Sequence, residues 1–118
     1  MLSELLTEKQ KVFEPHFKPD LLQRTSTVFQ FRFTLDEDFF LSVSQDLFSF
    51  NEGSATNPTL TLYLDHHETC WQLLMGTRNG MDAFINGQYR ADGNIVLSQL
   101  LVYLFKRADP TVVFKVQD

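Results

Sequence analysis

The residues best suited to chemistry lie in one short segment, which holds His66, His67 and the single cysteine, Cys70. Zinc sites normally use at least three protein ligands, whereas here His66 and Cys70 are one helical turn apart and His67 points elsewhere. A cysteine nucleophile needs a nearby base and a lowered pKa, but Cys70 precedes Trp71 on an apolar helix face. We therefore predict no metal ion, no cofactor and no catalytic residue, and we interpret Cys70 as a small buried side chain.

Two further segments carry residues that other proteins use for catalysis or phosphate binding. The acidic stretch from Asp36 to Asp38 has no histidine or second acidic cluster near it in the sequence, so we predict a solvated turn. The segment from Gly76 to Gly93 holds four of the five glycines, yet neither GxxxxGK[ST] nor GxGxxG occurs in it. A glycine-rich phosphate or nucleotide site is therefore excluded, and the glycines are predicted at junctions between short elements.

The composition indicates a folded, acidic protein, which we predict to be one domain over residues 1–118. Hydrophobic residues make up 43% of the chain, which includes twelve phenylalanines, and the net charge is −5. This charge argues against nucleic acid and against anionic membranes as partners. No apolar run is long enough to cross a bilayer, and neither a signal peptide nor a peroxisomal tail is evident. We therefore expect a cytoplasmic protein without stable membrane insertion.

Alternating apolar residues predict an antiparallel sheet in the first half of the chain. The clearest alternation is that of Leu60, Leu62 and Leu64 with Thr61 and Tyr63. Short links between the first three strands indicate a meander, and an amphipathic helix precedes the sheet. The predicted helix covers residues 2–13, and the predicted strands cover 28–35, 39–44, 48–50 and 60–64.

Apolar residues at helical spacing follow the fourth predicted strand. Asp65 is predicted to cap a helix as part of a capping box, and Gly76 is predicted to end that helix. A second short helix over 81–85, an edge strand over 88–92 and a last helix capped by Asn94 follow. Runs of strands followed by runs of helices indicate an α+β fold, with an antiparallel sheet of about five strands and the helices packed on one face.

The order of these elements and the glycine-marked block resemble the sterol carrier protein family of sterol-binding domains, in particular its small stand-alone bacterial members. The resemblance covers nearly the whole chain and is densest from PTLTLYLD through CWQLLMGTRNGMDAFINGQYRADGNIVLSQLLVYLF. The residues that match the family pattern are Asp65, Gly76, Ala83, Phe84, Gly87, Gly93 and the leucine-rich stripe from Leu97 to Phe105. The resemblance implies an apolar tunnel between sheet and helices, which holds acyl chains, acyl-CoA, sterols or phospholipids in relatives. Some relatives are fused to alkylsulfatases, and others hold isoprenoid intermediates of ubiquinone biosynthesis.

The function that the resemblance implies is non-catalytic binding or carrying of a hydrophobic ligand, such as a fatty acyl chain, an isoprenoid or another lipid. Such a ligand needs a continuous apolar wall of large, adaptable side chains. Each such residue taken alone is more often an ordinary core residue, so the hypothesis concerns the set. Arg78 and Arg90 could meet a carboxylate or phosphate head group, although solvated arginine is the commoner alternative. The predicted ligand-binding residues are Phe33, Phe50, Leu62, Trp71, Leu74, Met75, Met81, Phe84, Ile85, Leu101, Leu104 and Phe105.

An alternative function is a protein-interaction or dimerisation domain of lipid or ubiquinone metabolism with a closed cavity. Phe40, Tyr63 or the N-terminal helix would then form the contact. The partner would be a second copy of the chain or an enzyme of lipid metabolism. A long continuous tunnel would favour the lipid-binding function, and a closed interior together with a dimer would favour this alternative.

Overall fold

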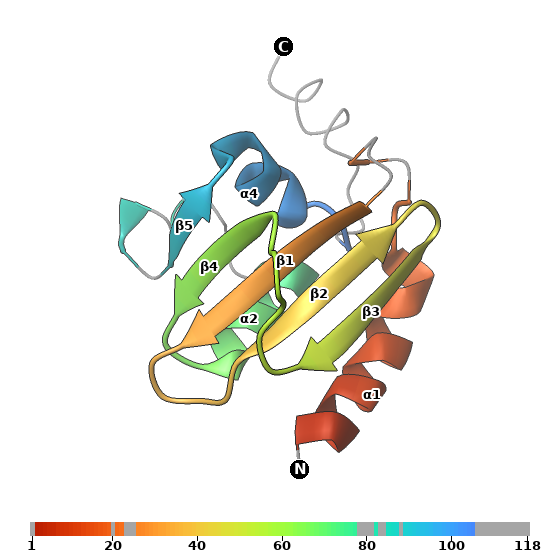
Figure 1. Ribbon diagram of the computed structural model, residues 1–118, viewed down its shortest axis with the longest axis horizontal. Helices are drawn as coiled ribbons and strands as arrows, with labels where there is room; N and C mark the ends of the chain where they lie inside the picture. The colour runs from red at the N-terminus through yellow and green to blue at the C-terminus, as the bar shows by residue number, and fades with distance from the viewer. Residues whose placement is uncertain are drawn as a thin grey trace.

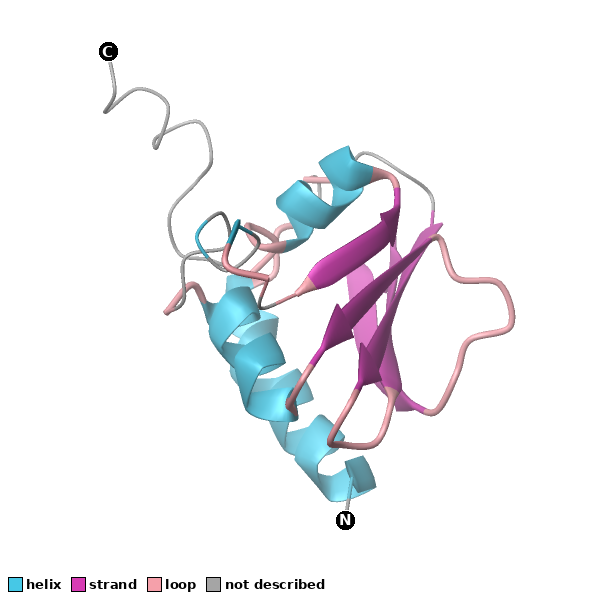
Figure 2. Ribbon diagram, turned by 90° about the vertical axis from the view of Figure 1, so that its left-hand side faces the viewer, coloured by secondary structure: helices cyan, strands magenta, loops and turns pink. Residues whose placement is uncertain are grey.

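The computed structural model describes residues 2–19, 21–22, 26–77, 82, 85–87 and 89–105. In this part of the chain, helices lie on one side of a five-stranded sheet with the strand order β3-β2-β1-β4-β5 (Figures 1 and 2). The prediction of an α+β fold with the helices on one face is therefore confirmed. The elements are α1 (Leu2–Phe13), the 3-10 helix η1 (Glu14–His16), β1 (Ser26–Phe33), β2 (Phe39–Ser44), β3 (Leu47–Glu52), β4 (Leu60–Leu64), α2 (His67–Met75), β5 (Arg90–Gly93) and α4 (Ile95–Leu101).

Strands β1, β2 and β3 form the predicted antiparallel meander. Strand β4 differs from the expectation, because it pairs with β1 in parallel, with Phe29 opposite Leu60. Since β3 runs in the same direction as β1, the link over residues 53–59 has to return along the sheet before β4 can begin. Strand β5 is antiparallel to β4, so the sheet is mixed but mostly antiparallel. In Figure 1 this link passes in front of the strands, on the side opposite the helices.

Gln30 holds the returning link against the sheet. Its side chain is fully buried, and its Oε1 accepts a hydrogen bond from the backbone N–H of Ala55 at 2.7 Å. Its Nε2 donates to the carbonyl oxygens of Gly53, at 3.1 Å, and of Phe39, at 3.2 Å. A buried amide without partners would destabilise the fold, and these bonds remove that cost while they position the link. The link thereby covers the part of this face around Gln30 without a helix.

The ends of the helices agree with the sequence in part. Gly76 has φ = 80° and ends α2, and Asn94 Oδ1 accepts hydrogen bonds from two backbone N–H groups of α4, as predicted. Helix α2, however, begins one residue later than predicted, with His66 in the N-cap position. Asp65 Oδ1 instead accepts from the His66 N–H and from the Thr69 hydroxyl, each at 2.7 Å. The carboxylate therefore ties the end of β4 to the first turn of α2.

The last helix is shorter than the leucine-rich stripe suggests. Helix α4 ends at Leu101, and Leu104 and Phe105 follow in turns that still place both side chains in the core. The predicted helix over 81–85 lies largely outside the described residues. No helix in the described ranges is both long enough and apolar enough to cross a bilayer.

Candidate functional site

Six aromatic side chains from five parts of the chain meet between the sheet and the helices, and we call them the aromatic cluster. The only tryptophan, Trp71 of α2, stacks on Phe39 with ring centroids 5.0 Å apart and planes 10° from parallel. The ring of Phe50 meets it edge-on at 5.4 Å. Phe13 of α1 lies 5.9 Å from the same indole and 4.9 Å from Phe105. The aromatic cluster comprises Phe13, Phe39, Phe48, Phe50, Trp71 and Phe105, none of which is more than 8% exposed.

Strand alternation and helical spacing explain how these rings converge. Phe48 and Phe50 are two residues apart on β3, so both face the helices. Leu6 and Phe13 are seven residues apart on α1 and lie on the face that packs against β3. Phe105 follows α4 and contacts Phe48 with a centroid separation of 4.9 Å. The aromatic cluster therefore joins the two ends of the described chain to the centre of the sheet.

The structure brings most of the predicted ligand-binding residues into one core. Met75 is 38% exposed and Ile85 is 71% exposed, so Met75 lies partly and Ile85 largely in solvent. Met81 and Phe84 lie outside the described residues. Whether the set binds a ligand stays a prediction. The predicted residues buried in the core are Phe33, Phe50, Leu62, Trp71, Leu74, Leu101, Leu104 and Phe105.

Three members of the aromatic cluster were not predicted as ligand-binding residues. Phe39 belongs to a strand whose alternation was recognised, and Phe48 to the neighbouring strand. Phe13 shares a helix stripe with Leu6, which marks it as buried. The periodicity identifies each of these as a core residue, but it carries no signal that they meet Trp71. That contact depends on where α1 and α2 pack on the sheet.

Trp71 also carries an unusual polar atom. Its indole Nε1 and the hydroxyl of Thr27 are buried side-chain atoms without a hydrogen-bond partner in the described part of the chain. The ammonium group of Lys9 lies 5.4 Å from the centre of the Trp71 ring. A buried donor without an acceptor is unfavourable, because it has lost water and gained nothing in exchange. The indole N–H is thus a buried donor that no described residue satisfies.

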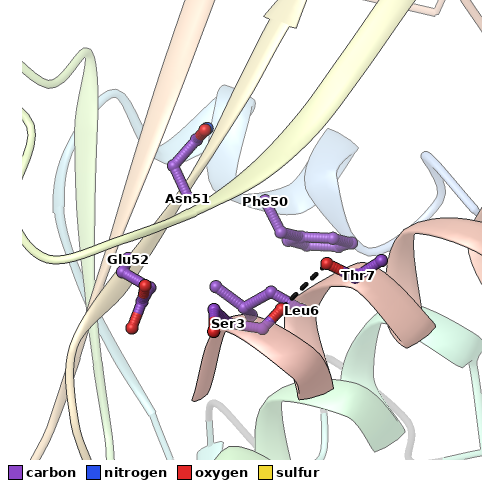
Figure 3. Close-up of a pocket in the computed structure, with 6 residues that line it drawn as sticks. All are labelled: Ser3, Leu6, Thr7, Phe50, Asn51 and Glu52. Carbon is purple, nitrogen blue, oxygen red and sulfur yellow. Dashed lines mark hydrogen bonds between the residues drawn. The ribbon is translucent and has the colours of Figure 1, made fainter. Parts of the chain in front are cut away.

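A cavity of about 260 Å³ lies beside the aromatic cluster, between α1 and the edge strand β3, and we call it the α1–β3 cavity. Its apolar side chains, Leu6 and Phe50, are 3% and 8% exposed. Figure 3 shows Phe50 and Glu52 on the side of β3 that faces α1, whereas the Asn51 side chain points away from the helix. The cavity therefore has an apolar floor with polar groups around it. The lining residues are Ser3, Leu6, Thr7, Phe50, Asn51 and Glu52.

Gln10 attaches α1 to the edge of β3 next to this cavity. Its Nε2 donates a hydrogen bond to the carbonyl oxygen of Phe48 at 2.6 Å, and its Oε1 accepts from the N–H of Phe50 at 3.1 Å. A side-chain amide thus pairs with the edge strand in the way that a neighbouring strand would. An unpaired edge promotes aggregation, and this contact protects part of it.

The described residues contain no group of three or more His, Cys, Asp or Glu side chains placed to hold a metal ion. Cys70 is buried, and desolvation raises the pKa of its thiol well above the usual value, so it stays protonated and unreactive. The histidines instead bind the acidic turn. The His67 N–H donates to the Asp36 carboxylate at 2.8 Å, and a His67 ring nitrogen lies 2.6 Å from the Glu37 carbonyl oxygen.

The acidic turn is exposed at Asp36 and Glu37, in agreement with the prediction of a solvated turn, and several hydrogen bonds hold it. The hydrogen bond from the His67 backbone lowers the pKa of Asp36, and burial opposes this only in part. Asp38 pairs with Arg32 at 3.1 Å and accepts a hydrogen bond from the N–H of Phe33 at 2.9 Å. These contacts fix the turn between β1 and β2 against the start of α2.

The arginine considered for a head group lies on the wrong side of the sheet for that role. Arg90 stacks over Tyr63, with its guanidinium carbon 4.5 Å from the ring centre, and the two residues are paired in register across β4 and β5. Leu60, Leu62 and Leu64 face the helices, so Tyr63 and Arg90 face the opposite side. Arg90 therefore cannot contact a ligand held between the sheet and the helices. Arg78 lies outside the described residues.

Comparisons with known proteins place this architecture in a family. A comparison with curated protein sequences finds no match. Among solved structures, a UbiJ-SCP2 ubiquinone synthesis protein superposes with a TM-score of 0.72 at 12% identity, over 86% of this chain and 93% of that one. Sterol carrier protein 2 like 2 from Aedes aegypti superposes with a TM-score of 0.58 at 19% identity, over 85% and 93%. The sec-alkylsulfatase Pisa1 from Pseudomonas sp. gives a TM-score of 0.68 at 16% identity, over 86% of this chain but only 16% of the alkylsulfatase.

These likenesses establish the fold, because the identities are too low to transfer a function. The sequence itself matches the model of the SCP-2 sterol transfer family over residues 8–106, which includes every described strand. The matched span also contains all six residues of the aromatic cluster. The chain belongs to the SCP-2 sterol transfer family.

Proposed function

We propose that this chain binds a long, mainly apolar ligand between its sheet and its helices, without carrying out a reaction on it. The observation that carries the proposal is the aromatic cluster, in which five phenylalanine rings pack together with a single tryptophan. Membership of a sterol transfer family supports it. So does the likeness in fold to palmitated SCP2L2 from Aedes aegypti.

The apolar character of the ligand follows from energetics. Burying a sixteen-carbon chain contributes about 13 kcal/mol, at roughly 0.8 kcal/mol for each methylene. Loss of translational and rotational freedom costs about 4–15 kcal/mol, and repacking the core costs roughly another 1–3 kcal/mol. At the lower end of these costs the balance is about −8 kcal/mol, which corresponds to a dissociation constant near 1 μM. A shorter or more polar ligand would lose most of this gain.

The aromatic cluster has to move for such a ligand to enter. Phe13, Phe50 and Trp71 contact one another at 5.4–5.9 Å, so displacing one ring opens space beside the other two. Aromatic side chains have only two rotatable bonds, and each ring turns as a unit. The unpaired Trp71 N–H would then meet an oxygen of the ligand or an incoming water.

Trp71 is also the natural reporter for a test of the proposal. Delipidated protein is titrated with hexadecan-1-ol, hexadecanoate and geranylgeraniol while the emission of Trp71 is followed and the complexes are weighed by native mass spectrometry. We expect the mass of one ligand to be added and the emission to change with at least one of the three. A bare protein mass together with unchanged emission for all three ligands would refute lipid binding.

Two matched substitutions test whether the ligand binds inside the protein. Leu101 is 1% exposed and Leu47 is 69% exposed, so leucine-to-phenylalanine changes at the two positions fill the core and the surface respectively. We expect Leu101→Phe to weaken ligand binding and Leu47→Phe to leave it unchanged, provided that both variants keep the far-UV circular dichroism of the parent. Equal affinities in the two folded variants would place the ligand elsewhere.

A further inference from the structure

The edge of β3 offers a second pair of hydrogen-bonding groups next to the pair that Gln10 occupies. Within a strand, the N–H and C=O of one residue point to the same edge, and alternate residues repeat this direction. Since Gln10 binds the Phe48 carbonyl and the Phe50 N–H, the Phe50 carbonyl and the Glu52 N–H also point toward α1. Within the described ranges, nothing pairs with these two groups as Gln10 pairs with the preceding two.

This second pair of groups lies where the α1–β3 cavity opens. Phe50 and Glu52 both line the cavity, with Ser3 and Thr7 on the opposite wall, contributed by α1 (Figure 3). The Thr7 hydroxyl donates to the Ser3 carbonyl at 2.9 Å, and its oxygen keeps the capacity to accept a hydrogen bond. Phe50, Glu52 and Thr7, the residues that carry the free carbonyl, the free N–H and the accepting hydroxyl, thus all line the cavity.

The floor of the cavity leads toward the aromatic cluster. Phe50 forms part of the floor, and the same ring packs against Phe13 at 5.7 Å and against Trp71 at 5.4 Å. Rotation of the Phe50 ring would therefore connect the cavity to the interior. A volume of 260 Å³ is too small for a long lipid but large enough for a polar head group with the first carbons of its chain.

We propose that the α1–β3 cavity is the head-group subsite of the ligand, and that it selects a neutral head group able both to donate and to accept hydrogen bonds. The inference rests on the lipid-binding function proposed above. A primary amide or a hydroxyl donates to the Phe50 carbonyl and accepts from the Glu52 N–H, as the Gln10 amide does one step along the strand. A carboxylate has no proton to donate, and it meets the carboxylate of Glu52, which is the one charged group among the described residues that line the cavity.

Ligands that share a chain and differ in the head group test this selectivity. Dissociation constants of hexadecanamide, hexadecan-1-ol and hexadecanoate are measured at pH 8 from Trp71 emission and checked by native mass spectrometry. We expect the amide and the alcohol to bind at least about tenfold more tightly than the carboxylate, because the carboxylate leaves the Phe50 carbonyl unpaired. Equal or tighter binding of hexadecanoate would overturn the inference and leave lipid binding intact, whereas no binding of any ligand would refute the proposed function itself.

Glu52→Gln tests the charge separately. Glu52 is exposed, so the substitution should not disturb folding, and we expect it to strengthen hexadecanoate binding about threefold relative to hexadecanamide binding. Glu8→Gln on the exposed surface of α1 removes the same charge away from the cavity and should change neither affinity. If both variants change the hexadecanoate affinity equally, the charge of Glu52 does not contribute to recognition of the head group.

A third pair of variants tests the cavity by filling it. Thr7 and Val12 are both exposed residues of α1, but only Thr7 lines the cavity. We expect Thr7→Phe to abolish the preference for the amide over the carboxylate and Val12→Phe to preserve it. A preference that survives in folded Thr7→Phe would place the head group outside the cavity.

Discussion

Replacing Gln10 with leucine removes the two hydrogen bonds that attach α1 to the edge of β3 and keeps a side chain of similar size. The bonds join Gln10 to the Phe48 carbonyl at 2.6 Å and to the Phe50 N–H at 3.1 Å, both in partly buried surroundings. Each such bond contributes about 1 kcal/mol net, so the variant should lose about 2 kcal/mol of unfolding free energy. For a chain of this length that loss lowers Tm by roughly 8 °C.

Two measurements separate this contact from a general weakening of the helix. Thermal unfolding is compared with that of Lys11→Leu, an exposed change on the same helix that should cost less than about 0.5 kcal/mol. Hydrogen exchange then reports on single amides of β3. The Phe50 amide should be protected in the parent and exchange faster in Gln10→Leu, whereas the Glu52 amide should exchange fast in both proteins. If the Phe50 amide stays equally protected in the folded variant, Gln10 does not pair with the edge strand and the reasoning is wrong.

Two further predictions concern the turn at Gly76 and the acidic groups near α2. Gly76→Ala should destabilise the protein by about 1 kcal/mol, because φ = 80° strains any residue with a Cβ atom, and equilibrium unfolding in urea measures the loss. A hydrogen bond from the His67 backbone lowers the pKa of Asp36, and one from the Thr69 hydroxyl lowers the pKa of Asp65. Both contributions are present above the unfolded pKa of about 3.9 and disappear as the pH falls through the lower folded values. Asp36→Asn should therefore flatten the fall of Tm below pH 4, and parallel curves for variant and parent would contradict this.

Local pattern was sufficient to predict the elements that depend on neighbouring residues. The alternation in β1 and β4, the glycine that ends α2 and the asparagine that caps α4 are all properties of a few adjacent residues. The parallel pairing of β4 with β1 is not determined by adjacent residues, because it depends on a link that returns over the sheet and is held by Gln30. Nothing in the alternation of Leu60, Leu62 and Leu64 distinguishes a parallel neighbour from an antiparallel one.

The site was predictable to a similar extent. Burial of residues such as Trp71, Leu74 and Leu101 follows from apolar spacing, and the structure places them in one core. The α1–β3 cavity could not be predicted, because Ser3 and Thr7 are ordinary helix-surface residues until α1 packs beside β3. Gln10 is likewise an unremarkable polar residue in the sequence, and its role arises from an edge strand nearly forty positions later.

The returning link between β3 and β4 has a consequence for the order of folding. The β1–β2–β3 meander has links of five and two residues, so it can form early at a small cost in chain entropy. β4 must find a partner 31 positions back, at Phe29, and α2 follows β4 in the chain. Formation of contacts with Trp71 therefore waits for a long-range pairing, which forms more slowly than the local pairs of the meander. Until then the helix-facing side of the meander exposes Phe29, Phe31 and Phe39 to water. Helix α1 is synthesised before the meander, so it is able to cover the edge of β3 during this time.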